Sequence, residues 1–271
     1  MSTSMTADSA GGQDHAELDA GLLAGVTDRG LRHHRNEDAV ALRTVHGPDG
    51  LIPVAVVSDG VSSAPRPDEA SLAAVQAAMG VLAAAAEAGD DPEAASVAAM
   101  RAAADALAGL AGPEGAPAAT YVSALAGQDA VTICWLGDSR AYWLAEDPEA
   151  CVRVTRDDSL AEELVASGVA SQEDAMASPQ AHVITRWLGA DLPDAEPHVR
   201  QFQPPGPGVL LICSDGLWNY RPEAADLASL VPFPDVFTDP LAAAAKLVKF
   251  AVDAGGMDNI TVALIPFQAV P

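Results

Sequence analysis

The sequence predicts an α+β domain, a layered sandwich of strands with helices outside, and two observations carry this prediction. Two alanine-rich segments, residues 69–88 and 93–111, follow each other along the chain and predict a pair of helices. Strand-like segments gather elsewhere, above all between residues 120 and 144, where short polar links join them. Because the runs of helices and strands are separated, alternating β-α-β units are disfavoured.

Length and charge bound the class of protein. A chain of 271 residues suits one large domain or two small ones and can bury a substantial core. Its 38 acidic and 14 basic residues give a net charge of −24, which repels nucleic acid and anionic membranes. A phosphorylated substrate is also repelled unless bound divalent cations reverse the local sign. We therefore expect no nucleic acid and no membrane as partners.

The three cysteines are an odd number, and Cys134 and Cys213 lie in apolar, strand-like runs. Reduced, packed thiols of this kind are typical of cytosolic proteins, so we expect a cytoplasmic protein without a disulfide framework. The first residues lack the pattern of a signal peptide, and the longest uncharged stretch, residues 70–86, is too weakly apolar for a convincing membrane span. We also expect a monomer.

The first part of the chain predicts a tail followed by a hairpin. Residues 1–20 are rich in Ser, Gly, Ala and Asp without apolar periodicity, which predicts a disordered tail before an ordered domain over residues 21–271. Residues 39–44 and 54–58 predict two strands joined by a turn at residues 47–50. Acidic residues stand at both open ends of this hairpin.

The central part predicts a helix pair and a meander. Asp91 and Pro92 between the two alanine-rich segments are typical of a helix start, with Asp as cap. The strands predicted over residues 121–125, 131–135 and 141–144 follow one another closely, so we expect an antiparallel meander.

A helical insertion is predicted over about residues 157–182, after a strand at residues 152–155. Ser159 and Glu162 form a capping box for a helix that ends at Gly168, and a second short helix follows Ser171. We interpret this insertion as a flap over the sheet edge. Further helices are expected over residues 222–230 and 240–254, and a final strand over residues 260–265.

The tripeptide Ser-Asp-Gly ends two predicted strands that lie 156 residues apart. The first stands in VAVVSDGVSS, residues 54–63, and the second in VLLICSDGLW, residues 209–218. A single Asp-Gly after a strand usually marks only a turn. A pair of identical endings favours a shared role for Asp59 and Asp215, and Gly60, without a Cβ, lets its carbonyl approach whatever Asp59 binds.

Other acidic residues fall at similar places: Glu37 and Asp38 before a strand, Asp138 after a strand, and Asp258 before the last strand. Five such carboxylate stations suit a site for two or three hard cations, Mn²⁺ or Mg²⁺, which take oxygen ligands. No His or Cys spacing typical of zinc is present. In so acidic a chain, solvated surface charges are the competing interpretation.

A series of motifs gives these residues a family resemblance. In order they are TDRG at residues 27–30, NEDA at 36–39, SDG at 58–60, GDSRAY at 137–142, ITRWLG at 184–189, CSDGLW at 213–218 and DNITV at 258–262. Together they resemble the metal-dependent serine/threonine protein phosphatases of the 2C, or PPM, family, in its bacterial form. The resemblance runs from about Leu22 to Ile265.

The resemblance implies a sandwich of two antiparallel sheets flanked by helix pairs, and hydrolysis of phosphoserine and phosphothreonine in proteins by a metal-activated water. It implies that Asp59 bridges two ions, Mn²⁺ or Mg²⁺. Glu37 and the Gly60 carbonyl would complete one ion, Asp215 and Asp258 the other, and Asp138 would share a third ion with Asp215. Asp38 would hold metal-bound water without touching the metal.

The sequence departs from the family pattern at three places. His33 stands where members commonly carry a phosphate-binding Arg, so three interpretations compete: His33 acts, Arg32 or Arg35 replaces it, or turnover is weak. Ser62 and Ser63 replace glycines, and Asp158 replaces a histidine that could protonate the leaving group.

Two other functions stay open. The alternative from another class is a catalytically weak or silent regulatory domain of the same fold that binds a phosphorylated partner. A phosphatase for a small phosphoester is the third possibility. For Arg140 and Arg186, we expect buried pairing with carboxylates that brace the site.

Overall fold

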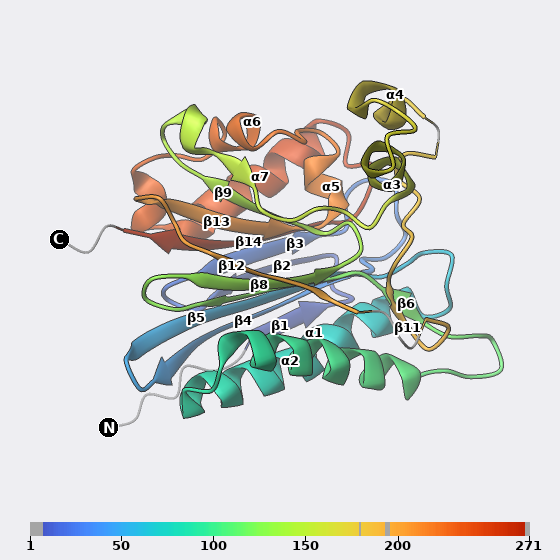
Figure 1. Cartoon of the computed structure of the whole chain (residues 1–271), viewed down its shortest axis with the longest axis horizontal. Helices are drawn as coiled ribbons and strands as arrows, with labels where there is room; N and C mark the ends of the chain where they lie inside the picture. The colour runs from blue at the N-terminus through green and yellow to red at the C-terminus, as the bar shows by residue number, and fades with distance from the viewer. Residues whose placement is uncertain (1–7, 179, 193–195, 269–271) are drawn as a thin grey trace.

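The structure is a computed structural model and describes residues 8–178, 180–192 and 196–268. Within these residues, two six-stranded antiparallel sheets pack face to face, and helices cover both outer faces (Figure 1). This arrangement confirms the predicted α+β sandwich.

The first sheet is covered by a helix pair. In spatial order it contains β1 (Asp8–Gly11), β4 (Asp38–Gly47), β5 (Gly50–Asp59), β7 (Tyr121–Ala126), β8 (Val131–Leu136) and β12 (His198–Phe202). Helices α1 (Pro67–Ala88) and α2 (Pro92–Ala108) lie on its outer face (Figure 1). As predicted, Asp91 caps α2 by accepting from Ala94 N. Buried alanines such as Ala78 and Ala103 let both helices pack closely.

The second sheet is covered by the C-terminal helices. In spatial order it contains β10 (Val152–Arg153), β9 (Arg140–Leu144), β13 (Gly208–Cys213), β14 (Ile260–Phe267), β3 (Ala24–Asp28) and β2 (His15–Asp19). Helices α5 (Asp215–Trp218), α6 (Ala224–Ala228) and α7 (Pro240–Asp253), with short 3₁₀ turns at Pro148–Ala150 and Asp235–Phe237, complete that side. Asp239 caps α7 by accepting from Ala242 N.

The alternation of side chains along a strand feeds two separate cores. On β4, Val40 and Leu42 join the core between the two sheets, whereas Ala39 and Ala41 join the core beneath α1. A third core lies between the second sheet and α7. Both faces of each sheet are therefore buried, which explains the nearly continuous apolar runs in β5 and β13.

The predicted N-terminal tail is wrong for residues 8–19. β1 pairs with β4, and β2 pairs with β3, so each forms an edge of its sheet. Few side chains of these strands are apolar: Ala10 and Leu18 are buried in the inter-sheet core, and Ala16 packs against it. Backbone hydrogen bonds hold such edge strands, and sequence periodicity does not reveal them. Residues 1–7 of the predicted tail lie outside the described residues.

The predicted meander over residues 121–144 is also wrong. β7 pairs with β8 in the first sheet, but β9 pairs with β10 and β13 in the second. The turn between β8 and β9 carries the chain from one sheet to the other, with Gly137 at a φ of 100° that favours glycine. Asp138 consequently lies where the two sheets meet.

The insertion predicted over residues 157–182 contains α3 (Leu160–Ala166) and α4 (Gln172–Met176), which protrude beside the sandwich (Figure 1). Ser159 caps α3 as predicted, and α4 follows Ser171 as expected, with the Ser171 side chain accepting from Asp174 N. The insertion has a small core of its own, formed by Ala161, Ala175 and Ala181. After it, β11 (Leu188–Gly189) pairs with β6 (Ala118–Ala119) in a separate two-stranded sheet.

Helix α1 is long and apolar enough to cross a membrane by length and composition. However, 56% of its most apolar stretch is buried inside the protein, where it packs against α2 and β4. In this structure α1 is a core helix.

Candidate active site

The first sheet brings two aspartates together at one end of the sandwich. Asp38 opens β4 and Asp59 closes β5, and the antiparallel register places these two residues directly opposite each other. Next to them, Gly60 N donates to the Glu37 carbonyl at 3.1 Å. The β4–β5 hairpin therefore places the carboxylates of Asp38 and Asp59 side by side.

The second sheet contributes the other pair. β13 and β14 are paired, so Asp215, just after β13, and Asp258, just before β14, lie at the same end of the sheet. A hydrogen bond of 3.0 Å from Ser214 N to the Thr261 carbonyl continues the pairing beyond β13. A Cβ on Gly216 would lie 1.9 Å from the Asn259 carbonyl oxygen, so only glycine permits this close approach.

Asp138 joins the cluster from the turn that connects the sheets. Its side chain is buried, and its backbone carbonyl accepts a 3.0 Å hydrogen bond from Trp218 Nε1. Trp218 ends helix α5, which begins with Asp215. Helix α5 therefore holds the turn at Asp138 through Trp218 and also contributes Asp215 to the cluster.

Burial and mutual repulsion raise the pKa of all five aspartates. Burial raises the pKa of Asp38 and of Asp138 to about 7. The pKa of Asp59 lies well above its usual range because of burial and the charges of the other four, and that of Asp215 is raised for similar reasons. Burial also raises the pKa of Asp258. The five carboxyls thus lie within electrostatic reach of one another, and the cluster favours a compensating cation.

The donor atoms fit a hard divalent cation. Asp38 Oδ1 and Asp215 Oδ1 are buried and have no hydrogen-bond partner in the structure. In the described part of the chain, no three His, Cys, Asp or Glu side chains already form a group that could hold an ion. Cations such as Mn²⁺ and Mg²⁺ use few carboxylates and complete their ligands with carbonyls and water. Only glycine fits directly after Asp59, because a Cβ at residue 60 would meet the Pro67 carbonyl oxygen at 2.2 Å.

Glu37 differs from the aspartates because both of its oxygens are engaged. Arg35 Nε donates to Oε1 at 2.9 Å, and Ser62 Oγ donates to Oε2. Arg35 Nη1 also lies 3.3 Å from Asp68 Oδ1, so the guanidinium contacts the carboxylates of both Glu37 and Asp68. The role of Glu37 as a metal ligand stays a prediction, and an ion would compete with Arg35 and Ser62 for it.

Of the three candidate phosphate ligands, His33 is the one that contacts an aspartate of the cluster. His33 Nε2 lies 3.1 Å from Asp258 Oδ1, and Arg29 donates to the His33 carbonyl at 3.2 Å. Arg32 is exposed, and Arg35 is paired with Glu37. The geometry favours His33 over either arginine as the side chain beside Asp258.

Two polar residues that sequence reasoning missed hold the site together. Ser214 Oγ donates to Asp38 Oδ2 at 2.7 Å and accepts from Thr261 N at 3.0 Å. Asn259 Oδ1 accepts from Glu37 N at 2.7 Å, and its amide donates to two backbone carbonyls of the loop between β3 and β4. Both residues stand inside recognised motifs, but nothing in the sequence indicates their partners.

Arg140 braces the site as predicted. Its guanidinium makes several hydrogen bonds to Asp157, the shortest at 2.7 Å, and it stacks 3.5 Å from the ring centroid of Trp218. For Arg186 the predicted carboxylate partner is present, since Arg186 Nε lies 3.8 Å from Asp158 Oδ1, but the predicted burial is wrong because the side chain is 47% exposed. Asp158 also accepts from Gly137 N at 3.0 Å and pairs with His198 at 2.8 Å.

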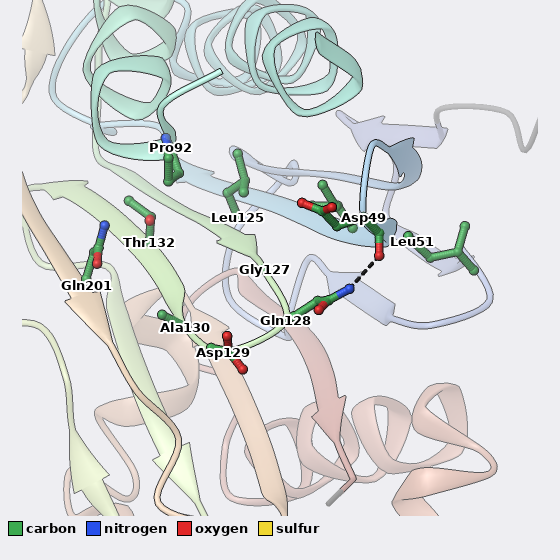
Figure 2. A pocket seen from close by; sticks show the side chains of 12 residues that line it. Asp49, Leu51, Pro92, Leu125, Gly127, Gln128, Asp129, Ala130, Thr132 and Gln201 are labelled. Carbon is green, nitrogen blue, oxygen red and sulfur yellow. Dashed lines mark hydrogen bonds between the residues drawn. The ribbon is translucent and has the colours of Figure 1, made fainter. Parts of the chain in front are cut away.

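A separate cavity of 320 Å³ lies at the turn of the β4–β5 hairpin. Figure 2 shows Asp49, Leu51, Gln128 and Asp129 around it, with a hydrogen bond from the Gln128 amide to the Asp49 carbonyl. β5 runs for 10 residues from this turn to Asp59, so the cavity lies about 30 Å from the acidic cluster. It is not part of the candidate active site.

Two antiparallel sheets packed face to face between helices, with carboxylates from both sheets at one edge, place the chain in the class of α+β sandwich proteins. The model of the family described as "Protein phosphatase 2C" matches residues 30–250, and the chain belongs to this family.

Several relatives resemble the chain. The serine/threonine phosphatase stp of Listeria innocua is 36% identical over 145 residues, which are 53% of this chain and 54% of that protein. The chain therefore matches only about half the length of this curated relative. The crystal structure of the Mycobacterium tuberculosis serine/threonine phosphatase PstP/Ppp is 27% identical, with a TM-score of 0.74 over 91% of this chain and 98% of that one.

A further solved structure, the catalytic domain of PstP in complex with two manganese ions, is 26% identical with a TM-score of 0.72. It covers 89% of this chain and 96% of that one. These likenesses confirm the two-sheet fold over nearly the whole chain.

Proposed function

We propose that this protein hydrolyses phosphoserine and phosphothreonine in phosphoproteins with the help of two divalent cations, Mn²⁺ or Mg²⁺. The observation that carries the proposal is the convergence of five carboxyl groups from both sheets, with raised pKa values and buried, unpartnered oxygens on Asp38 and Asp215. Family membership and a solved relative with two manganese ions support it.

In this proposal Asp59 would contribute to both ions, the Gly60 carbonyl and Glu37 would help to hold one, and Asp215 and Asp258 would help to hold the other. Asp138 and Asp215 would hold a third, weaker ion. When bound, such ions neutralise phosphoryl oxygens and lower the pKa of water.

Asp38, which Ser214 holds in place, and His33 complete the proposed chemistry. Ser214 fixes Asp38 through Oδ2, which leaves Oδ1 free to orient a water and accept its proton. His33, held at the rim by Asp258, contributes a hydrogen bond to the phosphoryl oxygens.

The test is hydrolysis of p-nitrophenyl phosphate and of a phosphothreonine peptide with and without Mn²⁺. We expect Mn²⁺-dependent release of phosphate from both, and a loss of at least about 100-fold in Asp59→Asn and Asp215→Asn, since loss of a metal ligand removes several kcal/mol of transition-state stabilisation. Asp129→Asn, at the far end of the first sheet, removes the same charge and serves as the matched control. Activity that survives in both site variants would refute the proposal.

The role of His33 has its own test. We expect His33→Ala to lower kcat/KM for p-nitrophenyl phosphate at least about fivefold, the loss expected when one hydrogen bond to a charged group is removed. Arg32→Ala should have a smaller effect because Arg32 is exposed. Wild-type rates in His33→Ala would assign phosphate binding elsewhere.

One observation favours the silent regulatory domain as the second candidate. Arg35 and Ser62 occupy both oxygens of Glu37, and His33 engages Asp258, so two proposed ligands already have partners. If the protein binds a phosphothreonine peptide in calorimetry but releases no phosphate at saturating Mn²⁺, this candidate replaces the enzyme.

We further propose a cytoplasmic monomer that acts on phosphorylated proteins. The three cysteines are free, and burial raises the pKa of Cys134 to about 12 and that of Cys213 beyond its usual range, which keeps both thiols protonated and unreactive. Cell fractionation and the mass in solution test location and oligomeric state.

A further inference from the structure

A groove of 570 Å³ adjoins the acidic cluster. Its walls are the loop that follows Gly60, residues 61–65, and the segment that returns from the helical insertion, residues 182–191. The walls are mainly apolar, with Val61, Pro65, Ile184 and Trp187 among the lining residues.

The inner end of the groove is joined to the site on both sides. Val61 directly follows Gly60, and Val61 N donates to the Ala118 carbonyl at 2.9 Å. On the opposite wall, the ring centroid of His182 lies 5.7 Å from that of Trp218, which ends the helix that begins with Asp215. The groove therefore opens directly beside the acidic cluster.

The outer end carries an aromatic ring beside a carboxylate. Trp187 Nε1 donates to Asp191 Oδ1 at 3.1 Å. Gly189 makes room for this contact, because a Cβ there would lie 2.5 Å from Asp191 Oδ1 and 3.1 Å from the Trp187 ring. An indole with an adjacent carboxylate is suited to the guanidinium of Arg or the ammonium of Lys.

Strand spacing gives the distance between the two ends. Gly60 bridges to Ala119, and Ala119 pairs with Leu188, next to Trp187. Two strand spacings are about 10 Å, the length of about three extended residues.

Charge also selects a basic segment. The chain carries a net charge of −24, and the described residues that line the groove include Asp191 but no Lys or Arg. A basic peptide is attracted to such a surface and an acidic one is repelled.

We propose that this groove binds the segment beside the phosphorylated residue, and that Trp187 and Asp191 select an Arg or Lys about three residues away from it. The inference rests on the proposed phosphatase function and adds the substrate class: phosphoproteins with a basic residue at that distance.

The experiment compares phosphothreonine peptides that carry Arg or Glu three residues before, or three residues after, the phosphothreonine, with Mn²⁺-loaded full-length protein. In one of the two directions, we expect kcat/KM for the Arg peptide to exceed that for the Glu peptide by about 5- to 20-fold, from one cation–π contact and one ion pair. Asp191→Asn should reduce this ratio at least about threefold, and Trp187→Phe, which keeps an aromatic ring, should reduce it less. Asp129→Asn makes the same change of net charge at the far end of the sheet and should keep the wild-type ratio.

The outcomes separate the two proposals. If the wild-type protein fails to hydrolyse p-nitrophenyl phosphate, the phosphatase function fails. If it hydrolyses that compound and all four peptides at equal kcat/KM, the function stands and the groove proposal is overturned. The groove proposal is also overturned if Asp191→Asn and Asp129→Asn change the ratio equally, since the preference would then come from net charge alone.

Discussion

The two Ser-Asp-Gly units share a sequence but use their serines differently. Ser58 Oγ donates to the Thr120 carbonyl at 2.7 Å, a contact within the first sheet. Ser214 Oγ donates to the Asp38 carboxylate at 2.7 Å, across the junction of the two sheets. The motif predicts where each aspartate lies, whereas the neighbours of each serine decide whether it belongs to the scaffold or to the site.

Unlike the serines, the glycines of the two units have the same role: each is required because a neighbouring backbone oxygen leaves no room for a Cβ. A Cβ on Gly60 would lie 2.2 Å from a backbone oxygen, and a Cβ on Gly216 would lie 1.9 Å from another. The backbone is therefore crowded in the same way at both glycines, although the two serines have different roles.

The largest effect on stability is expected when either glycine is replaced by a residue with a Cβ. Gly60→Ala and Gly216→Ala should each lower the free energy of unfolding by about 3 kcal/mol or more, since a backbone segment must move. Gly80→Ala on helix α1 is the control, because a Cβ there meets nothing within 4 Å and helix propensity favours alanine by about 1 kcal/mol. Urea unfolding measures all three. Equal stability of Gly216→Ala and Gly80→Ala would contradict the reason given for the glycine.

The next largest effect is the dependence of thermal stability on pH, which comes from the buried aspartates of the two units. The pKa of Asp59 and of Asp215 is raised far above its usual value, and burial raises that of Asp38 to about 7. A group with a raised pKa in the folded state stabilises the protein at low pH, and this contribution is lost as pH rises through the folded pKa. The Tm of the metal-free protein should therefore fall as the pH rises from about 4 to about 7.

Mn²⁺ should oppose this loss, because the cation neutralises the carboxylates that form as pH rises. Thermal scans in a chelator and in Mn²⁺ should show a stabilisation by metal that is larger at neutral pH than at pH 5. A metal effect that is independent of pH would show that the carboxyls do not share one ion site.

The serine comparison predicts an intermediate effect. Ser214→Ala leaves Asp38 Oδ2 and Thr261 N without their partner and should lower kcat by about 10- to 100-fold, as expected for a residue that orients a group at a metal site. Ser58→Ala should cost about 1 kcal/mol of stability and leave kcat within about twofold of wild type. Steady-state kinetics with p-nitrophenyl phosphate, together with urea unfolding, separates the two. Equal losses of kcat in both variants would remove the distinction.

The smallest effect concerns the residues that follow the first unit. Ser62→Gly releases Glu37 Oε2 and should tighten Mn²⁺ binding by up to about fivefold, the equivalent of one hydrogen bond. Ser63→Gly is the matched control, because Ser63 is exposed and lies one residue further along. Titration calorimetry gives both affinities. Unchanged affinity in Ser62→Gly would mean that Glu37 does not bind the metal.

Local signals predicted the parts of the fold that local contacts determine. The β4–β5 hairpin and the caps Asp91 and Ser159 formed as expected, because each depends on a few neighbouring residues. The edge strands β1 and β2 were missed because distant backbone partners stabilise them, not their own side chains. The sheet to which β9 belongs was wrong for a similar reason, since β13, more than 60 residues away, pairs with it.

The site divides in the same way. The convergence of Asp59, Asp138, Asp215 and Asp258 agrees with their predicted places at strand ends. The contacts of Glu37 with Arg35 and Ser62, and of His33 with Asp258, depend on side-chain positions that no spacing in the sequence encodes.

The division of the acidic residues between two sheets has one further consequence. Asp38 and Asp59 end strands whose Val40 and Val57 pack in the inter-sheet core against residues such as Ile212 and Ala263 of the other sheet. The thickness of that apolar layer sets how far the two halves of the ligand set stand apart. In the proposed metal site, affinity for the cation should therefore depend on the packing of the sandwich interior, and removal of a methyl group deep in the core should weaken metal binding at the sheet edge.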